Sequence, residues 1–250
     1  MQTLNPSGAS PAVRNSPGAI VRSLHEQCAQ VVAHSTRADN EALLGESYVF
    51  ASDLDVWREA IAAGPSARML TDAAAEYVMS MLNVCQGQYR NAFKGLRMVL
   101  ELCMQSSFLS AHLVLREEWL KGKADTIWAT LVDADDGPLS VRFGRAFFPE
   151  LDGHITHFRQ LCQTLYRELS ECIHGNVPNH IPLPTGLVFS QESFALWHEK
   201  ARLVRLVVHF SFALRHLKSI PASRRSDVAA VLLDQLGHIE AIRTECIREI

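Results

Sequence analysis

Apolar residues recur at intervals of three and four along most of the chain, which is the spacing of one face of an α-helix. The clearest example is the segment 151–174, which ends before Gly175 with Pro178 close behind. Glycine can adopt the left-handed conformation that closes a helix, and proline cannot continue one. The predicted buried face of this helix consists of Phe158, Leu161, Cys162, Leu165, Leu169, Cys172 and Ile173. Because little strand-like alternation accompanies this pattern, we expect an all-α fold.

The same spacing and its Gly, Pro and Ser boundaries predict helices in the rest of the chain. Residues 1–17 are polar and rich in Pro, Gly and Ser, so we expect a disordered tail there. An N-terminal helical extension is predicted over 18–65 and a larger helical domain over 66–250. The other predicted helices cover about 19–35, 38 into the fifties, 53–63, 66–83, 86–110, 114–121, 191–219 and 223–248.

Composition narrows the class of protein. The 250 residues carry a net charge of -3, so any nucleic-acid binding needs a local basic patch rather than overall charge. The six cysteines form no CxxC pair and lie in apolar helical patterns, which predicts buried free thiols in a reducing compartment. Neither a signal peptide nor a stretch of about 18 uninterrupted apolar residues is present. We therefore expect a cytoplasmic protein that does not span a membrane.

A polar stripe runs along the segment 151–174 beside its apolar face. Arg167, Ser170, Glu171 and His174 stand at positions i, i+3, i+4 and i+7 and therefore line up on one side of the helix. This pairing suits RNA cleavage, in which the 2'-hydroxyl attacks the adjacent phosphate. Histidine can move the required protons near neutral pH, and arginine can hold the phosphate as its charge grows. Such cleavage needs no metal or cofactor and leaves a cyclic phosphate and a 5'-hydroxyl.

The structural alternative for this stripe is a polar helix edge. A histidine in the last turn of a helix is stabilised by the helix dipole, by a few tenths up to about 1 kcal/mol. Arg167 can equally be solvated or paired with Glu171. A related stripe of Arg90, Lys94, Arg97 and Glu101 lies along the predicted helix 86–110 and either faces the first stripe across a groove or is a solvated edge.

Two other groups of residues are candidates for binding. Arg202, Arg205, His209 and His216 share one face of the predicted helix 191–219, and this is the best local basic patch for an RNA backbone. Its alternative is a solvated or internally paired face. His154 and His157 form an HxxH pair, but two ligands one turn apart hold a metal only with further ligands, so no metal site is expected.

The motif residues resemble a known superfamily. The sequence RELSECIHGN (167–176) resembles the Arg-x(4–6)-His motif of HEPN-domain proteins, with six residues between Arg167 and His174. Tyr166, Leu169-Ser170 and His174-Gly175 also fit the "Y..LS...HG" ending of many bacterial members. The sequence departs from the commonest form of the motif, which has a polar residue, often Asn, directly after the arginine, because Glu168 stands there.

The resemblance extends upstream and covers about residues 75–217. The sequence YRNAFKGLRMVLELCMQSSFLSAH (89–112) resembles the first long HEPN helix, in which an "LR..LE" element is common. Leu96-Arg97 and Leu100-Glu101 match that element, and the segment 119–122 is similar to the short stretch that often follows it.

The resemblance implies an antiparallel helical bundle that dimerises, with the Arg/His motifs of two protomers meeting in a composite site. It also implies an endoribonuclease that acts as a toxin or as an abortive-infection effector against phage, controlled by an antitoxin or a sensor protein. His174 would be the acid and base, and Arg167 would stabilise the phosphate. Supporting roles would fall to Arg97, Glu101, Ser170 and Asn176, and RNA contacts to Arg90, Lys94, Arg202 and Arg205.

A second hypothesis remains open from the sequence. The chain can instead be a non-catalytic HEPN-like module that binds RNA, a nucleotide or a partner protein. The two hypotheses differ in whether the Arg167/His174 pair reaches solvent.

Overall fold

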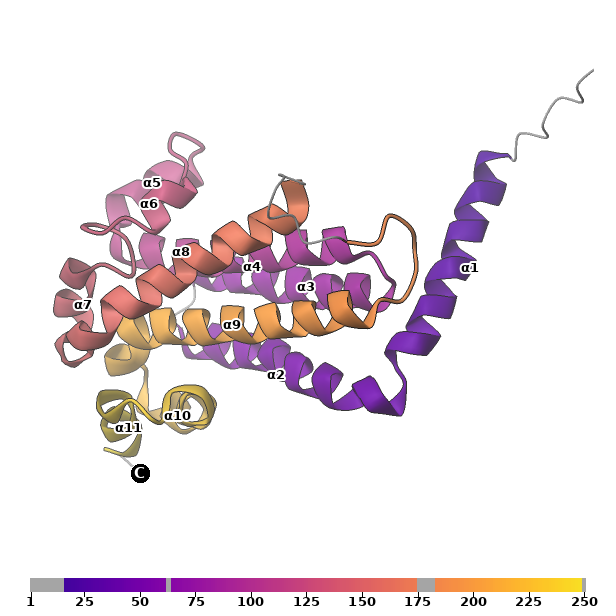
Figure 1. Cartoon of the computed structure of the whole chain (residues 1–250). Helices are drawn as coiled ribbons and strands as arrows, with labels where there is room; N and C mark the ends of the chain where they lie inside the picture. The colour runs from indigo at the N-terminus through magenta and orange to yellow at the C-terminus, as the bar shows by residue number, and fades with distance from the viewer. Residues whose placement is uncertain (1–15, 62–63, 175–182, 249–250) are drawn as a thin grey trace, which may run out of the picture.

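A computed structural model describes residues 16–61, 64–174 and 183–248, with only the backbone placed for Pro65, Ser66 and His174. All regular structure in these residues is helical, which confirms the all-α fold (Figure 1). Taken singly, none of their helices is long and apolar enough to cross a membrane. The helices α4 (Tyr89–Ala111) and α5 (Leu113–Leu120) would qualify only as one segment, and a bend of 120° separates them.

Five long helices form the body of the molecule. They are α2 (Ala38–Ala60), α3 (Pro65–Cys85), α4, α8 (Asp152–His174) and α9 (Gln191–His216). Helix α9 contacts α2, α4 and α8, while α3 packs between α2 and α4 (Figure 1). As a result, α9 is buried along most of its length, and the predicted motif helix α8 lies at the side of the bundle against α4 and α9.

Shorter elements gather at one end of this bundle (Figure 1). Near α4 and α8 they are α5, α6 (Trp128–Leu131), α7 (Val141–Phe147) and the 3-10 turn Pro149–Leu151. After α9 come the 3-10 turn Leu217–Ser219, α10 (Ala222–Leu236) and α11 (Glu240–Ile247). Helix α1 (Pro17–Ser35) projects from the opposite end of the bundle (Figure 1).

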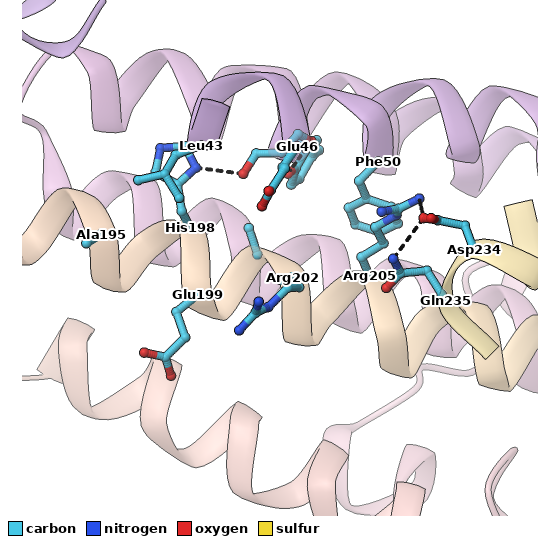
Figure 2. Close-up of a pocket in the computed structure, with 13 residues that line it drawn as sticks. Leu43, Glu46, Phe50, Ala195, His198, Glu199, Arg202, Arg205, Asp234 and Gln235 are labelled. Atoms are coloured by element: carbon cyan, nitrogen blue, oxygen red, sulfur yellow. Dashed lines mark hydrogen bonds and ion pairs between the residues drawn. The ribbon is translucent and has the colours of Figure 1, made fainter. Parts of the chain in front are cut away.

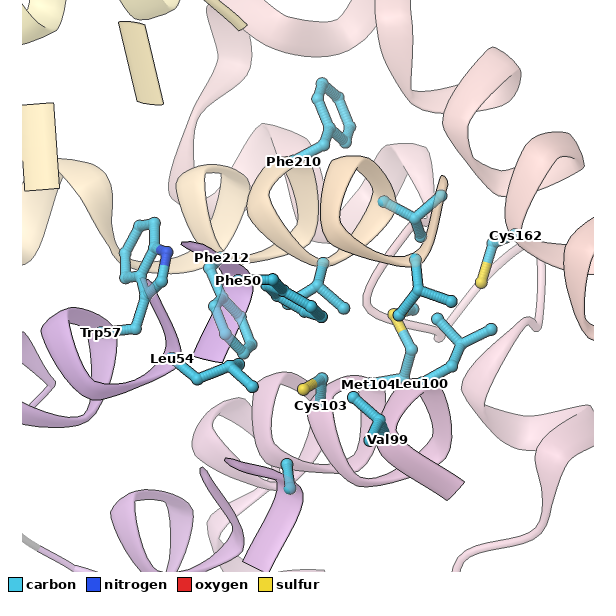
Figure 3. Close-up of a cluster of buried hydrophobic side chains, with 14 of the residues drawn as sticks. Phe50, Leu54, Trp57, Val99, Leu100, Cys103, Met104, Cys162, Phe210 and Phe212 are labelled. Carbon is cyan, nitrogen blue, oxygen red and sulfur yellow. The ribbon is translucent and has the colours of Figure 1, made fainter. Parts of the chain in front are cut away.

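The core is built where α2, α4, α8 and α9 meet. Trp57 and Phe212 pack edge to face with ring centroids 5.3 Å apart, and Phe158 stacks on Phe210 at 3.7 Å. Figure 3 shows Trp57, Phe210 and Phe212 with Leu54, Val99, Leu100, Cys103, Met104 and Cys162 around them. All six cysteines are free thiols and five are buried, as the sequence predicts.

The structure corrects three predicted boundaries. Two helices expected between 38 and 63 are one continuous helix, α2, and the single helix expected over 223–248 is divided into α10 and α11. The first helix begins at Pro17, capped by the Ser16 hydroxyl, while residues 1–15 of the predicted tail lie outside the described part of the chain. Within the range 18–65, α2 contributes residues to the bundle core, whereas α1 contributes no fully buried residue to it.

Candidate functional site

The motif helix α8 runs antiparallel to α4, and the polar stripe of α4 faces it. The Arg90 guanidinium donates a 2.7 Å hydrogen bond to the carbonyl of Ile173, and seven residues further along α4 Arg97 donates to the Tyr166 hydroxyl. Ile173 directly precedes His174, so Arg90 lies at the end of the helix that carries the motif histidine. The stripe of α4 therefore contacts α8 at Tyr166 and Ile173, the residues that directly precede Arg167 and His174.

Arg167 projects into solvent from this edge of α8. Its side chain is 71% exposed, and the nearest acid, Glu171, is 3.8 Å away. Ser170 uses its hydroxyl locally and donates to the Tyr166 carbonyl at 2.7 Å, one turn earlier in the helix. The side chain of His174 and the whole of Asn176 lie outside the described residues.

Arg97 and Glu101 hold the middle of α8 rather than its end. Their side chains form an ion pair at 3.1 Å, and the Arg97 guanidinium lies 4.5 Å from the centre of the Tyr166 ring. Burial and the nearby Glu101 carboxylate raise the pKa of Tyr166 to about 12, so its hydroxyl stays protonated. Both residues therefore support α8 through Tyr166.

An aromatic contact that the sequence pattern did not reveal strengthens this cluster. Trp128 of α6 stacks on Tyr166 with ring centroids 3.8 Å apart and an angle of 8° between the planes. Sequence analysis could mark Trp128 only as a large apolar residue near a loop, because the stacking partner is 38 residues away.

A cleft of about 510 Å³ opens beside the start of α4. Arg90 lines it, together with Leu24 and Gln27 of α1, the turn between α3 and α4, and the segment 184–187. Gly87 shapes this turn, since it has a φ of 74° and a Cβ there would meet the Val188 carbonyl at 3.0 Å. Lys94 lies exposed one turn further along α4. Arg90 thus both lines the open cleft and bonds to the end of α8 that carries the motif.

Glu168, the residue after the motif arginine, points toward α9. Its carboxylate pairs with the Lys200 ammonium at 3.0 Å, and Lys200 also pairs with Glu199 at 3.1 Å. Burial alone would lower the pKa of Lys200, but these two carboxylates outweigh burial and raise the pKa. Glu168 is therefore neutralised on a different side of the helix from Arg167.

The predicted basic face of α9 is mostly internal. Arg205 is buried and donates to Asp53 at 2.6 Å and to Asp234 at 3.0 Å, and His209 and His216 are buried as well. Arg205 is therefore not available to an RNA backbone in this structure. Of that face only Arg202 is exposed.

A second cavity, of about 570 Å³, lies between α2, α9 and α10 (Figure 2). Arg202 from α9 and Glu46 from α2 project into it, and neither has a hydrogen-bond or ion-pair partner among the described residues. Ser47 and His198 line it with a 2.6 Å contact between Oγ and Nδ1, and burial lowers the pKa of His198 to about 4. The cavity thus offers one free positive and one free negative group beside a neutral imidazole.

No protein-family model, curated protein or solved structure matches the chain. Within the part of the chain that the structure describes, no three His, Cys, Asp or Glu side chains are grouped so that they would hold a metal ion.

Proposed function

We propose that the chain is a metal-independent endoribonuclease of the HEPN type, with Arg167 and His174 as its catalytic residues. The observation that carries the proposal is the antiparallel pairing of α4 with α8. It brings Arg90 to the residue before His174, beside an open cleft, and leaves Arg167 exposed on the same helix.

The proposed chemistry assigns one role to each group. His174 takes the proton from a ribose 2'-hydroxyl, the 2'-oxygen attacks the neighbouring phosphorus, and the bond from phosphorus to the 5'-oxygen breaks. A proton returned by histidine neutralises the departing 5'-oxygen. Arg167 binds the phosphate oxygens while their negative charge increases, and Arg90 adds a second positive charge at the helix end.

Arg167 is held weakly enough to change partners. Its contact with Glu171 spans 3.8 Å at the protein surface, where an ion pair contributes about 0–1 kcal/mol. A phosphate dianion-like transition state offers a better bidentate partner than one distant carboxylate. The pairing of Glu168 with Lys200 keeps the other nearby acid away from the phosphate.

The proposal includes a homodimer in which the two motif ends meet. Such a site would combine two Arg167/His174 pairs around one RNA strand. The cellular role that fits is that of a toxin or anti-phage effector, restrained or triggered by an antitoxin or sensor protein.

RNA cleavage by the purified chain in EDTA tests the proposal. His174→Ala is expected to abolish cleavage, while His157→Ala, an exposed histidine earlier on the same helix, leaves it unchanged. Circular dichroism of both variants establishes that each is folded. Full activity of a folded His174→Ala variant would exclude the mechanism.

The second cavity favours one alternative, a non-catalytic module that binds a nucleotide, RNA or partner. Arg202 and Glu46 are its free charged groups. If this alternative holds, the wild-type chain cleaves no RNA but binds a labelled nucleotide or RNA oligomer, and Arg202→Ala weakens that binding at least tenfold. Cleavage that depends on His174 rules it out as the main function.

A further inference from the structure

Helix α1 is covered only at its C-terminal end. There the Ser35 hydroxyl donates to the Cys85 carbonyl at 2.9 Å, and Val31 is buried against the turn that contains Gly87. The N-terminal half projects away from the bundle (Figure 1) and exposes Ile20, Val21 and Leu24 at 49%, 65% and 45%.

These exposed residues continue the face by which α1 is anchored. Ile20, Leu24 and Val31 are spaced by four and seven residues, so one apolar stripe runs from the docked end of α1 to its free end. A helical segment shorter than about 12–15 residues, such as the free half of α1, is only marginally stable in water without tertiary contacts. Burial of this apolar stripe against another surface would therefore stabilise the free half of α1.

A second uncovered apolar surface begins close to the point where α1 is anchored. On α3, Val78, Met79 and Leu82 are exposed at 43%, 51% and 42%, and Leu82 lies one turn before Cys85. The neighbouring helices α2 and α4 add exposed apolar side chains, namely Tyr48, Val49 and Met98. Exposed apolar side chains on the three adjacent helices α2, α3 and α4 are a feature that protein interfaces commonly have.

We propose that these two surfaces cover each other between two copies of the chain. The free half of α1 from one copy lies on the α2/α3/α4 surface of the second copy, and the second copy returns the same contact around a two-fold axis. This arrangement buries both apolar sets at once, because each copy carries one of each. Each partner in a standard interface contributes about 800 Å², so an interface of that size needs both apolar sets of each copy.

The proposed contact through α1 would also bring the second copy close to the proposed active site. Val31 and Leu24 of α1 lie beside the turn that leads to Arg90 and the end of α8. A second copy bound through α1 therefore sits at the end of the bundle where the motif helix ends. This inference rests on the dimer of the proposed function and specifies the surfaces that form it. The experiments that test the interface do not depend on RNA cleavage.

The first test is the molar mass of the full chain by light scattering after size-exclusion chromatography. The wild type is expected at twice the mass of one chain, and Leu24→Glu at the mass of one chain. Val114→Glu, on α5 and outside both surfaces, is the matched control and should remain dimeric, since Val114 is 76% exposed. A monomeric wild type, or a dimeric Leu24→Glu variant, would overturn the proposal.

Cross-linking distinguishes this interface from any other dimer. Leu24→Cys and Met79→Cys are made in separate chains that also carry Cys28→Ser, because Cys28 is the one native cysteine that is not buried. A short bis-maleimide should join the two chains when they are mixed and should join neither variant alone. A mixture without cross-linked product, from chains that are dimeric by mass, would place the interface elsewhere and refute the proposal.

Discussion

The buried histidines of α9 are held in the neutral form by their surroundings. The indole N–H of Trp57 donates to His209 Nδ1 at 3.2 Å, so Nδ1 is an acceptor and the ring proton must sit on Nε2. Nε2 then donates to Asp53 at 2.9 Å. Burial lowers the pKa of His209 and keeps this tautomer uncharged, and Asp53 is left to balance Arg205.

Neutral buried histidines predict a loss of stability in acid. Burial lowers the pKa of His198 to about 4 and of His216 to about 3, while both titrate near 6.5 in the unfolded chain. Below pH 6.5 the unfolded state therefore binds protons that the folded state does not. The free energy of unfolding should fall by about 1.4 kcal/mol per pH unit for each histidine, from about pH 6.5 down to about pH 4.

Urea unfolding at several pH values measures how steeply the free energy of unfolding falls with acid. A variant at His216 shows how much of this slope comes from that residue. His216→Leu removes one buried histidine, whose Nε2 has no hydrogen-bond partner among the described residues. Its stability should fall less steeply with acid, by the equivalent of about one proton, even if its stability at pH 7.5 differs. Parallel curves for wild type and variant would show that His216 is not neutral in the folded protein.

Lys200 is predicted to protect the motif from the charge of Glu168. Lys200→Met leaves the Glu168 carboxylate unpaired, which should lower kcat/KM for RNA cleavage about tenfold through repulsion of the phosphate. Adding Glu168→Gln to Lys200→Met removes that charge and should restore most of the activity. Equal activity of the single and double variants would mean that Glu168 does not act on the phosphate.

At the scale of elements, α3 and α4 approach most closely at Gly95. A Cβ at Gly95 would lie 2.6 Å from the Ser80 Cβ. Ser80 cannot move easily, because its hydroxyl donates to the Ala92 carbonyl at 2.6 Å and accepts from the Trp197 indole at 3.1 Å. The two helices therefore need glycine at this position.

Gly95→Ala should therefore destabilise the fold by about 1–3 kcal/mol despite the better helix propensity of alanine. Gly45→Ala on α2 is the control, since a Cβ there meets nothing within 4 Å, and it should stabilise the protein by about 0.5–1 kcal/mol. Thermal unfolding of the two variants gives both values. A stable Gly95→Ala protein would mean that α3 and α4 are further apart than described.

Arg90 is predicted to fix the end of the motif helix. Arg90→Ala removes the hydrogen bond to the Ile173 carbonyl and one positive charge from the cleft, so RNA cleavage should drop about tenfold or more. Amide exchange over residues 170–173 should become faster. Lys94→Ala, one turn away and exposed, is expected to change cleavage less and exchange not at all. The reverse ranking would contradict this role.

Helix positions could be predicted from the sequence better than helix partners. The bounds of α8 and α9 were predicted well from the 3–4 spacing of apolar residues, because the buried faces of these two helices are long and regular. The same spacing wrongly divided α2 at Asp53, since an acid after Ser52 resembles a helix start. In the structure Asp53 is buried, and Arg205, 152 residues away in the chain, neutralises it. A pairing over that distance leaves no trace in local periodicity, which is also why α9 looked like a basic surface.

At the scale of the whole molecule, the candidate functions occupy different places. The Arg167/Arg90 end of α8 and the free half of α1 are at one end of the bundle, and the Arg202/Glu46 cavity lies along α2 and α9 (Figures 1 and 2). The sequence left open whether the stripe of α4 faces α8 or solvent, and in the structure Arg90 and Arg97 of that stripe contact α8. The Tyr166 cluster between the two helices was not predicted, because Trp128 is joined to it only by the fold.

The chemical ends of the cleaved RNA test the central claim most directly. The account predicts that the wild-type chain, in EDTA, cuts a labelled single-stranded RNA into fragments with a 2',3'-cyclic phosphate and a 5'-hydroxyl, and that His174→Ala produces none. A substrate with a 2'-deoxyribose at the cut position should resist cleavage. Fragments with a 5'-phosphate, or equal cutting of the deoxy substrate, would contradict attack by the 2'-hydroxyl and with it the proposed mechanism.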